Sequence, residues 1–258
     1  MAQPIPLRHA QDLLKASCHQ CSLSNLCLPL AVGEGDLARL EDIVYQGRVY
    51  NRGDHIFEQS DRARSCFAVK SGAVRTSIVN ENGDEQVTGF FLPGELVGLE
   101  SLSGGDYACT ARALERTSLC EFPVDKLEQL SGALPDLQHH MFHLMGQEIQ
   151  TGHQMAMLLS RNTAEQRIAA LLLSLSSRFQ RRRLSPTRLT LPMPRSDIAS
   201  FLGLAVETVS RVFTRFQKQG LIHAQGRQVE LLDLPALQAV YRDNGEDAPR
   251  CQQHHSQG

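Results

Sequence analysis

The chain has 258 residues, of which 41% are hydrophobic and 21% are charged, and its formal net charge is −2. This length suits two domains with ordinary buried cores. No run of 18 apolar residues occurs, and residues 1–11 lack the apolar centre of a signal peptide, which together exclude membrane-spanning and secreted classes and predict a soluble cytoplasmic protein.

The charge is distributed unevenly along the chain. Residues 1–160 carry 12 Lys or Arg against 20 Asp or Glu, whereas residues 161–230 carry 12 against 4. A net charge of +8 within 70 residues is typical of a nucleic-acid-binding module. The acidic first part is not expected to contact phosphates.

Three thiols lie close together near the amino terminus, in C-x2-C-x5-C spacing: Cys18, Cys21 and Cys27. Three soft ligands can hold one face of a metal centre, but a closed site needs a fourth ligand from elsewhere in the chain. The spacing does not choose between Zn(II) and an iron-sulfur cluster. The remaining cysteines, among which we expect the fourth ligand, are Cys66, Cys109, Cys120 and Cys251.

These four candidates are not equivalent. Seven cysteines in a reducing compartment favour metal binding or redox sensing over a disulfide framework. Cys66 lies in a predicted strand and is expected to be a small core residue. Cys251 lies in a polar tail with no expected metal role, and the residue pattern does not separate Cys109 from Cys120.

The first half of the chain predicts one short helix followed by a sheet domain. Asp36 is a plausible N-cap for a helix that carries Leu37, Leu40, Ile43 and Val44 on one side. Residues 49–122 then show short alternating apolar runs separated by turn signals, of which Asn82-Gly83 is the strongest hairpin signal. This pattern predicts a compact antiparallel barrel or roll.

A helical period follows over residues 134–161. One stripe has the 3-4 spacing of a coiled-coil seam and predicts a symmetric dimer, with core burial inside one subunit as the alternative. Its members are Phe142, Met145, Ile149, Gly152, Ala156 and Leu159. A second stripe is expected to face the roll, and it consists of Leu137, Met141, Leu144 and Leu158.

The basic segment contains a helix-turn-helix pattern. Residues 163–166 fit a capping box that opens a helix, and residues 189–191 are expected to form a short strand. Within residues 197–212, Ala199 is the small residue where two helices cross, and Gly203 lies in the turn. Gly220 is expected to end the second helix, and residues 221–232 are expected to form a two-stranded wing.

The second helix of this pattern presents side chains that can read base edges. We assign Arg211 to guanine and Glu207 to cytosine, with Ser210 and Thr208 beside them, because guanidinium, carboxylate and hydroxyl groups match those edges. A carboxylate facing phosphates would otherwise be repelled, so Glu207 indicates specific readout. The alternative, a helical hairpin that only packs, does not explain the surrounding positive charge.

With these parts in place, the chain resembles the FNR/ANR family of oxygen-responsive regulators, within the cyclic-AMP-receptor superfamily. The resemblance runs from about residue 18 to residue 232. Its most specific pieces are the cysteine spacing, residues 83–90, residues 120–123 and residues 206–211.

The resemblance implies that Cys18, Cys21, Cys27 and Cys120 ligate a 4Fe-4S cluster, that the cluster-bearing form is a homodimer, and that oxygen destroys the cluster. It also implies binding to double-stranded DNA with two TTGAT half-sites, read by Glu207, Ser210 and Arg211. Contact with RNA polymerase is implied at a hairpin that includes Val79, Asn80, Gly83 and Asp84.

Two departures from the superfamily pattern matter. Gly94-Glu95 matches a nucleotide-binding pair, but no Lys or Arg occurs from residue 76 to residue 111, and Tyr107 lies near the expected arginine, so no cyclic nucleotide is expected. Gly152 stands where the family often has an acidic residue. Losing that like-charge repulsion is expected to make the dimer less dependent on the cluster.

We therefore predict an α+β chain that is a transcription activator and not an enzyme. Its parts are a cluster-binding arm (1–35), a cyclic-nucleotide-binding-like antiparallel β-roll (36–133), a dimerisation helix (134–161), a winged helix-turn-helix domain (162–240) and a disordered tail (241–258). The alternatives are a regulator on the same scaffold with a zinc or thiol redox input, and an iron-sulfur electron carrier.

Overall fold

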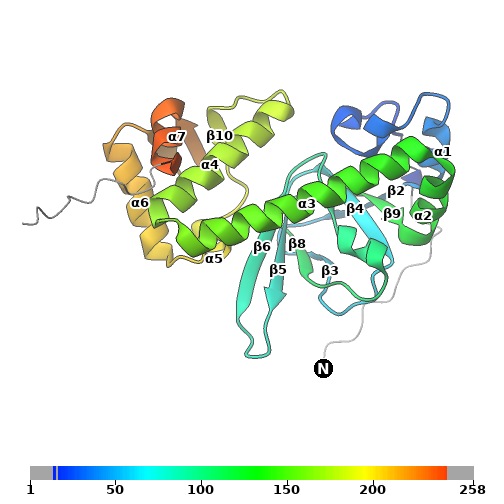
Figure 1. The fold of residues 1–258 in the computed structure, drawn as a ribbon, viewed down its shortest axis with the longest axis horizontal. Coiled ribbons are helices and arrows are strands. Elements are labelled where there is room, and N and C mark those ends of the chain that lie inside the picture. The colour runs from blue at the N-terminus through cyan, green and yellow to red at the C-terminus, as the bar shows by residue number, and fades with distance from the viewer. Residues whose placement is uncertain (1–13, 16, 243–258) are drawn as a thin grey trace, which may run out of the picture.

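The computed structural model describes residues 14–15 and 17–242. A β-roll, the long helix α3 (Pro135–Arg161) and a small domain of helices and short strands follow one another along the chain (Figure 1). Cys251 and most of the predicted tail lie outside the described residues. Tyr241 and Arg242, which we expected in the tail, instead complete helix α7 (Leu234–Arg242).

The roll consists of two antiparallel sheets. Their strands are β1 (Leu14–Lys15), β2 (Tyr45–Tyr50), β3 (His55–Phe57), β4 (Ser65–Ser71), β5 (Val74–Val79), β6 (Glu85–Phe91), β7 (Leu96–Val97), β8 (Thr110–Ala113) and β9 (Thr117–Pro123). One sheet has the order β1-β2-β9-β4-β7 and the other has the order β3-β8-β5-β6. The predicted antiparallel roll is confirmed.

Short helices connect and cover these strands. They are η2 (Ser24–Leu26), η3 (Leu28–Ala31), α1 (Leu37–Ile43), η4 (Leu99–Ser103) and α2 (Val124–Ala133). The predicted helix after Asp36 is α1, but the Asp36 side chain does not cap it and accepts a hydrogen bond from Arg39 at 2.9 Å. Asp36 has αR backbone angles, whereas a capping side chain usually requires the extended region.

The predicted hairpin at Asn82-Gly83 joins β5 to β6. Val79 pairs with Glu85, and Gly83 has φ of 85°, a conformation that glycine adopts without steric cost. The Asn80 side chain accepts hydrogen bonds from the N–H groups of Asn82 and Asp84, each at 2.9 Å. These bonds hold the tip of the hairpin in one conformation.

Two buried clusters stabilise the roll. One lies between the sheets and contains the stacked rings of Phe57 and Tyr107, whose centroids are 3.8 Å apart. The other lies between the roll and its covering helices and includes Phe122 and Cys66, both fully buried. The expectation that Cys66 is a core residue is confirmed.

Helix α3 runs along the roll and continues towards the C-terminal domain (Figure 1). Leu137 and Met141 are buried against the roll, and Leu144 is partly buried there, as the second apolar stripe predicted. Leu158 is buried in a cluster that combines roll residues such as Val87 and Phe90 with the core of the C-terminal domain. The last turns of α3 therefore lie against a core that both domains share.

The C-terminal domain packs around a buried core to which the roll contributes Ala73, Val87, Phe90, Leu92 and Leu114. Its elements are α4 (Ala164–Arg181), β10 (Arg188–Thr190), α5 (Arg195–Leu202), α6 (Val206–Lys218), β11 (Ile222–Gln225), β12 (Gln228–Leu231) and α7. The three strands have the order β10-β12-β11, so the predicted two-stranded wing gains a third strand. Both bonds of the predicted capping box form between Thr163 and Gln166.

The helix-turn-helix consists of α5 and α6. Gly203 lies in the turn with φ of 60°, and Ala199 is buried at the crossing, as predicted. Arg167 of α4 donates to the carbonyl of Leu202 at 2.9 Å and to the carbonyl of Leu159 at 2.8 Å. Because these carbonyls end α5 and α3, one guanidinium fixes the position of the helix-turn-helix against the long helix.

Candidate metal centre and nucleic-acid interface

The cysteine arm, residues 17–31, consists mainly of turns. Cys18 accepts a hydrogen bond from the N–H of Cys21 at 3.2 Å, and Cys27 precedes helix η3, where Pro29 lies in the first turn. Only Cys18, Leu28 and Pro29 are buried in the arm. The arm is held on the roll mainly by Leu28, which is fully buried in the cluster against which Cys27 and Cys120 pack.

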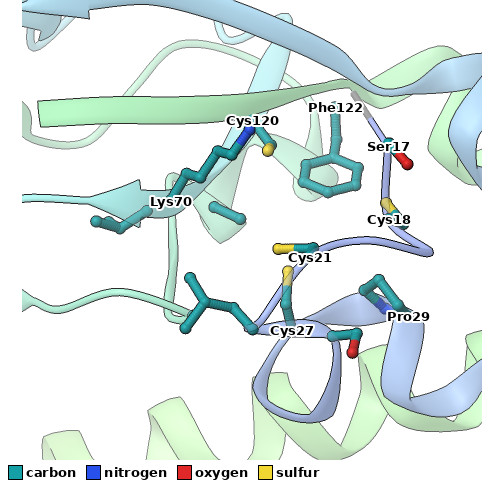
Figure 2. Close-up of a pocket in the computed structure, with 13 residues that line it drawn as sticks. Ser17, Cys18, Cys21, Cys27, Pro29, Lys70, Cys120 and Phe122 are labelled. Carbon is teal, nitrogen blue, oxygen red and sulfur yellow. The ribbon is translucent and has the colours of Figure 1, made fainter. Parts of the chain in front are cut away.

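The arm folds over the roll where β4 and β9 lie side by side. Cys120 of β9 pairs with Ala68 of β4 in the register of the sheet. Figure 2 shows the side chains around the resulting pocket, in which the three arm cysteines and Cys120 line one space together with Lys70. The structure therefore brings the four sequence-predicted cysteines together.

The other two described cysteines lie elsewhere. Cys109 packs beside the core between the sheets, and its thiol donates to Glu100 Oε1 at 3.2 Å. Cys66 is buried in the core and does not line the pocket. The sequence alone did not separate Cys109 from Cys120, but their positions in the roll do.

Burial sets the protonation state of the thiols in this pocket. Burial, together with the neighbouring Cys120, raises the pKa of Cys18 to about 12. Burial likewise raises the pKa of Cys27 and of Cys120 above the ordinary range. These thiols are neutral at physiological pH in the absence of a cation, and thiolate ligation therefore requires a metal centre that displaces their protons.

Four thiols line this pocket, whose apolar walls come from Ala68, Val69 and Phe122. Four cysteines can hold either a tetrahedral zinc ion or an iron-sulfur cluster. The donor set therefore fits a thiolate-ligated metal centre.

Glu41 of α1 holds the beginning of the arm, a role that no sequence pattern indicated. Its Oε1 accepts hydrogen bonds from the N–H of Cys18 at 2.5 Å and from the N–H of His19 at 2.9 Å. The His19 ring lies 3.0 Å from the same oxygen. These contacts hold the pKa of Glu41 below its ordinary value and orient the chain that carries the first two thiols.

Helix α6 has one buried and one exposed face. Val209, Val212, Phe213 and Phe216 are buried in the domain core. Glu207, Ser210 and Arg211 are exposed on the other side, as expected for residues that read bases, while Thr208 is half-buried. Three of the predicted DNA-reading side chains thus face solvent.

Local hydrogen bonds orient two of these side chains. Arg211 Nη2 donates to Thr208 Oγ1 at 3.2 Å, so Thr208 holds the guanidinium along the helix. Ser210 Oγ donates to the carbonyl of Val206 at 3.0 Å. Arg215, one turn further along, is ion-paired with Glu165 of α4.

The remaining predicted site residues lie on two other surfaces. On α3, Phe142 and Ile149 are 61% exposed, Gly152 and Ala156 are also exposed, and Met145 is half-buried. Such large apolar groups on one face of a single chain require a covering partner. Val79, Asn80, Gly83 and Asp84 are exposed on the hairpin between β5 and β6.

The position that resembles a nucleotide site is filled by the protein itself. The Glu95 carboxylate is ion-paired with Arg178 and, at 2.6 Å, with Arg182. Tyr107 is buried and donates to the carbonyl of Ser65 at 2.5 Å. Neither side chain is available to a ligand in this arrangement.

Among the described residues, none of the helices combines the length and hydropathy of a membrane span.

Two family models match the chain. The cyclic nucleotide-binding domain matches residues 47–132, and the Crp-like helix-turn-helix domain matches residues 166–240. Among solved structures, that of FixK2 from Bradyrhizobium japonicum aligns with a TM-score of 0.70 and 29% identity, covering 76% of this chain and 96% of that one.

Relatives align over almost the whole chain. The transcriptional activator protein FnrA of Stutzerimonas stutzeri is 50% identical over 240 residues, covering 93% of this chain and 97% of the relative. The transcriptional activator protein anr of Pseudomonas aeruginosa is 48% identical with the same coverage. The fumarate and nitrate reduction regulatory protein of Escherichia coli K12 is 40% identical over 220 residues, 85% of this chain and 88% of the relative.

These relatives are regulators and not enzymes, and their identity to this chain extends through both the roll and the helix-turn-helix. The chain therefore belongs to the FNR/Anr family of transcriptional activators, within the CRP superfamily.

Proposed function

We propose that the protein is an oxygen-sensing transcription activator whose DNA binding depends on a 4Fe-4S cluster held by Cys18, Cys21, Cys27 and Cys120. The observation that carries this proposal is the pocket in which a roll cysteine meets three arm cysteines, on a chain that also has an exposed recognition helix. Family membership supplies the oxygen response.

Residues of this chain would bind the cluster and would order the arm when it is bound. The four cysteines would ligate the cluster, which supplies an oxygen-labile centre when bound. Ligation would join the arm to β9 through Cys120, while Glu41 keeps the first turn of the arm in place. Because the arm has almost no core of its own, its order would depend on these ligands.

Dimerisation would connect the arm to DNA. The exposed stripe with Phe142 and Ile149 would pair with the same stripe of a second chain. Pairing would set the separation of the two α6 helices, which must be about 34 Å to enter successive major grooves. Glu207, Ser210 and Arg211 would then read two TTGAT half-sites, and the hairpin at Val79–Asp84 would face RNA polymerase.

Two alternatives are less well supported. Zinc could be held by the same four thiols, but it would not supply the oxygen response that family membership favours. A cyclic nucleotide would need the Glu95 carboxylate, which Arg178 and Arg182 occupy.

The test is an absorption spectrum of protein purified without oxygen, followed during exposure to air. Iron, sulfide and zinc are determined on the same sample, and binding to a TTGAT palindrome is measured before and after exposure. We expect about four irons and four sulfides per chain, as a 4Fe-4S cluster requires, and a visible band that decays together with DNA binding. A colourless, iron-free protein that binds this DNA unchanged in air would overturn the cluster mechanism.

A further inference from the structure

The turn Leu92–Glu95 lies between the cysteine pocket and the C-terminal domain. Gly94 has φ of 88°, and the N–H of Glu95 donates to the carbonyl of Leu92 at 3.0 Å. The Glu95 carboxylate also accepts from the N–H of Leu92 at 2.9 Å. Proline at the second position and glycine at the third suit a type II turn, so this turn is stiff.

One side of the turn contacts the pocket. Gly94 lines the pocket, and a Cβ atom added to it would lie 2.8 Å from Cβ of Leu26, which is on the arm next to Cys27. The N–H of Gly94 donates at 2.7 Å to the carbonyl of Val69 on β4, whose neighbour Ala68 is paired with Cys120. The turn therefore touches the arm directly and shares a strand pair with the fourth cysteine.

The other side of the turn holds helix α4. Arg178 Nε donates to Glu95 Oε1 at 2.9 Å, and Arg182 Nε donates to the carbonyl of Pro93 at 2.7 Å. Arg178 also donates to the carbonyl of Phe90 at 2.6 Å. Burial by itself would raise the pKa of Glu95, but the two guanidinium groups outweigh it and hold that pKa below its ordinary value.

Helix α4 and the recognition helix share one core, which Phe90 and Leu92 of the roll also join. Leu172 and Leu175 of α4 are fully buried in the same core as Val209 and Phe216 of α6. A close-packed core of this kind transmits a shift rather than absorbing it. A constraint on the end of α4 is therefore a constraint on the orientation of α6.

We propose that the turn Leu92–Glu95 links the cysteine pocket to the recognition helix within one subunit, through Leu26 on one side and Arg178 and Arg182 on the other. This link rests on the proposed cluster, because ligation of the arm would hold Leu26 against Gly94. It acts in addition to dimerisation: loss of the cluster would free the arm, loosen the turn and release α4 from a fixed orientation.

The test uses hydrogen exchange of the full-length protein, with and without its cluster, under nitrogen. In the wild type, cluster removal should increase exchange in residues 17–27, at Gly94 and Glu95, and at residues 178–182. In Glu95→Gln, the arm should still respond, whereas residues 178–182 should exchange rapidly in both forms. Bound to its cluster and fully dimeric, this variant should bind the TTGAT palindrome about tenfold more weakly.

Glu115→Gln is the matched control. Glu115 also joins the roll to the C-terminal domain, through an ion pair with Arg227 at 2.9 Å, but both partners are exposed and neither touches the turn. This variant should retain the wild-type exchange pattern and bind DNA within about twofold of wild type, as expected for an exposed pair.

Arg182→Gln is a second variant, for the case that Glu95→Gln does not fold. It leaves the ion pair between Glu95 and Arg178 intact. It should show the same loss of response at residues 178–182 with an unchanged thermal unfolding curve. The link is overturned if hydrogen exchange at residues 178–182 of the wild type does not change when the cluster is removed. It is also overturned if folded, cluster-bearing Glu95→Gln or Arg182→Gln binds DNA like the wild type. Absence of iron from the wild type would instead refute the proposed function, and the link with it.

Discussion

The cysteine arm and the C-terminal domain are held together in opposite ways. The domain is built around buried side chains from α4, α5 and α6, which Phe90 and Leu92 of the roll join, and its first helix begins with a complete capping box. The arm has two short 3-10 turns, and η2 contains no buried residue at all. Its order comes from contacts with other elements, such as the hydrogen bonds from Cys18 and His19 to Glu41.

This difference shows where a signal can enter the molecule. A segment with little folding energy of its own is ordered or released by a single ligand, whereas a domain with a full core keeps its shape through the change. Sensing is therefore expected in the arm, and sequence reading is expected in the domain, whose internal fold does not need the arm. The following variants test this division.

The largest expected effect is that of Cys120→Ala. Removing the only roll ligand should abolish cluster binding, because three arm thiols cannot close the site. Cys120 is only half-buried, so the roll should stay folded. Iron and sulfide analysis together with circular dichroism checks both points, and Cys109→Ala is the control. Iron lost from Cys109→Ala but kept by Cys120→Ala would reverse the assignment.

Phe216→Ala should destabilise the C-terminal domain. Phe216 is 1% exposed in the core of the C-terminal domain, and truncating such a side chain costs about 3 to 5 kcal/mol of unfolding free energy. Urea unfolding should show the loss, and DNA binding should fall. The iron content of the protein should not change. Loss of iron from this variant would show that the arm is not independent of the domain.

Glu41→Ala should weaken the arm without removing a ligand. Supporting groups of this kind typically contribute about 10- to 100-fold to metal affinity, and Glu41 supports two backbone N–H groups of the arm. Cluster retention during titration with an iron chelator measures the effect. Asp36→Ala, which loses only an exposed ion pair with Arg39, should behave as wild type. Equal retention by both variants would contradict the role of Glu41.

Arg211→Ala should change only the discrimination between DNA sequences. We expect a loss of about 1 to 3 kcal/mol of discrimination at one guanine, with cluster content unchanged, because Arg211 is exposed and far along the chain from the arm. Competition between half-sites that differ at single base pairs measures it. Lys218→Ala removes a charge from the same helix and should weaken binding to all DNA sequences alike. A uniform loss in Arg211→Ala would argue against base reading.

The parts of the fold that depend on local patterns were predictable from the sequence. The capping box at Thr163 and the turn at Gly203 were both placed correctly, because each rests on residues three or four positions apart. The Asp36 cap was wrong in its contacts, since side-chain direction depends on backbone angles that composition does not reveal. Periodicity likewise identified Leu158 as a buried residue of α3, but not that the C-terminal domain would share in covering it.

The sequence by itself determined the family, the order of the elements and the three arm thiols, because motifs and periodicity are local. Only the tertiary structure decided which roll cysteine meets the arm. It alone revealed the contacts of Glu41 and those that Arg178 and Arg182 make with the turn Leu92–Glu95. Glu41 contacts Cys18 across 23 residues, and Glu95 contacts Arg178 across 83. Contacts at such separations leave no spacing pattern, since they arise from chain packing and not from any repeat along the chain.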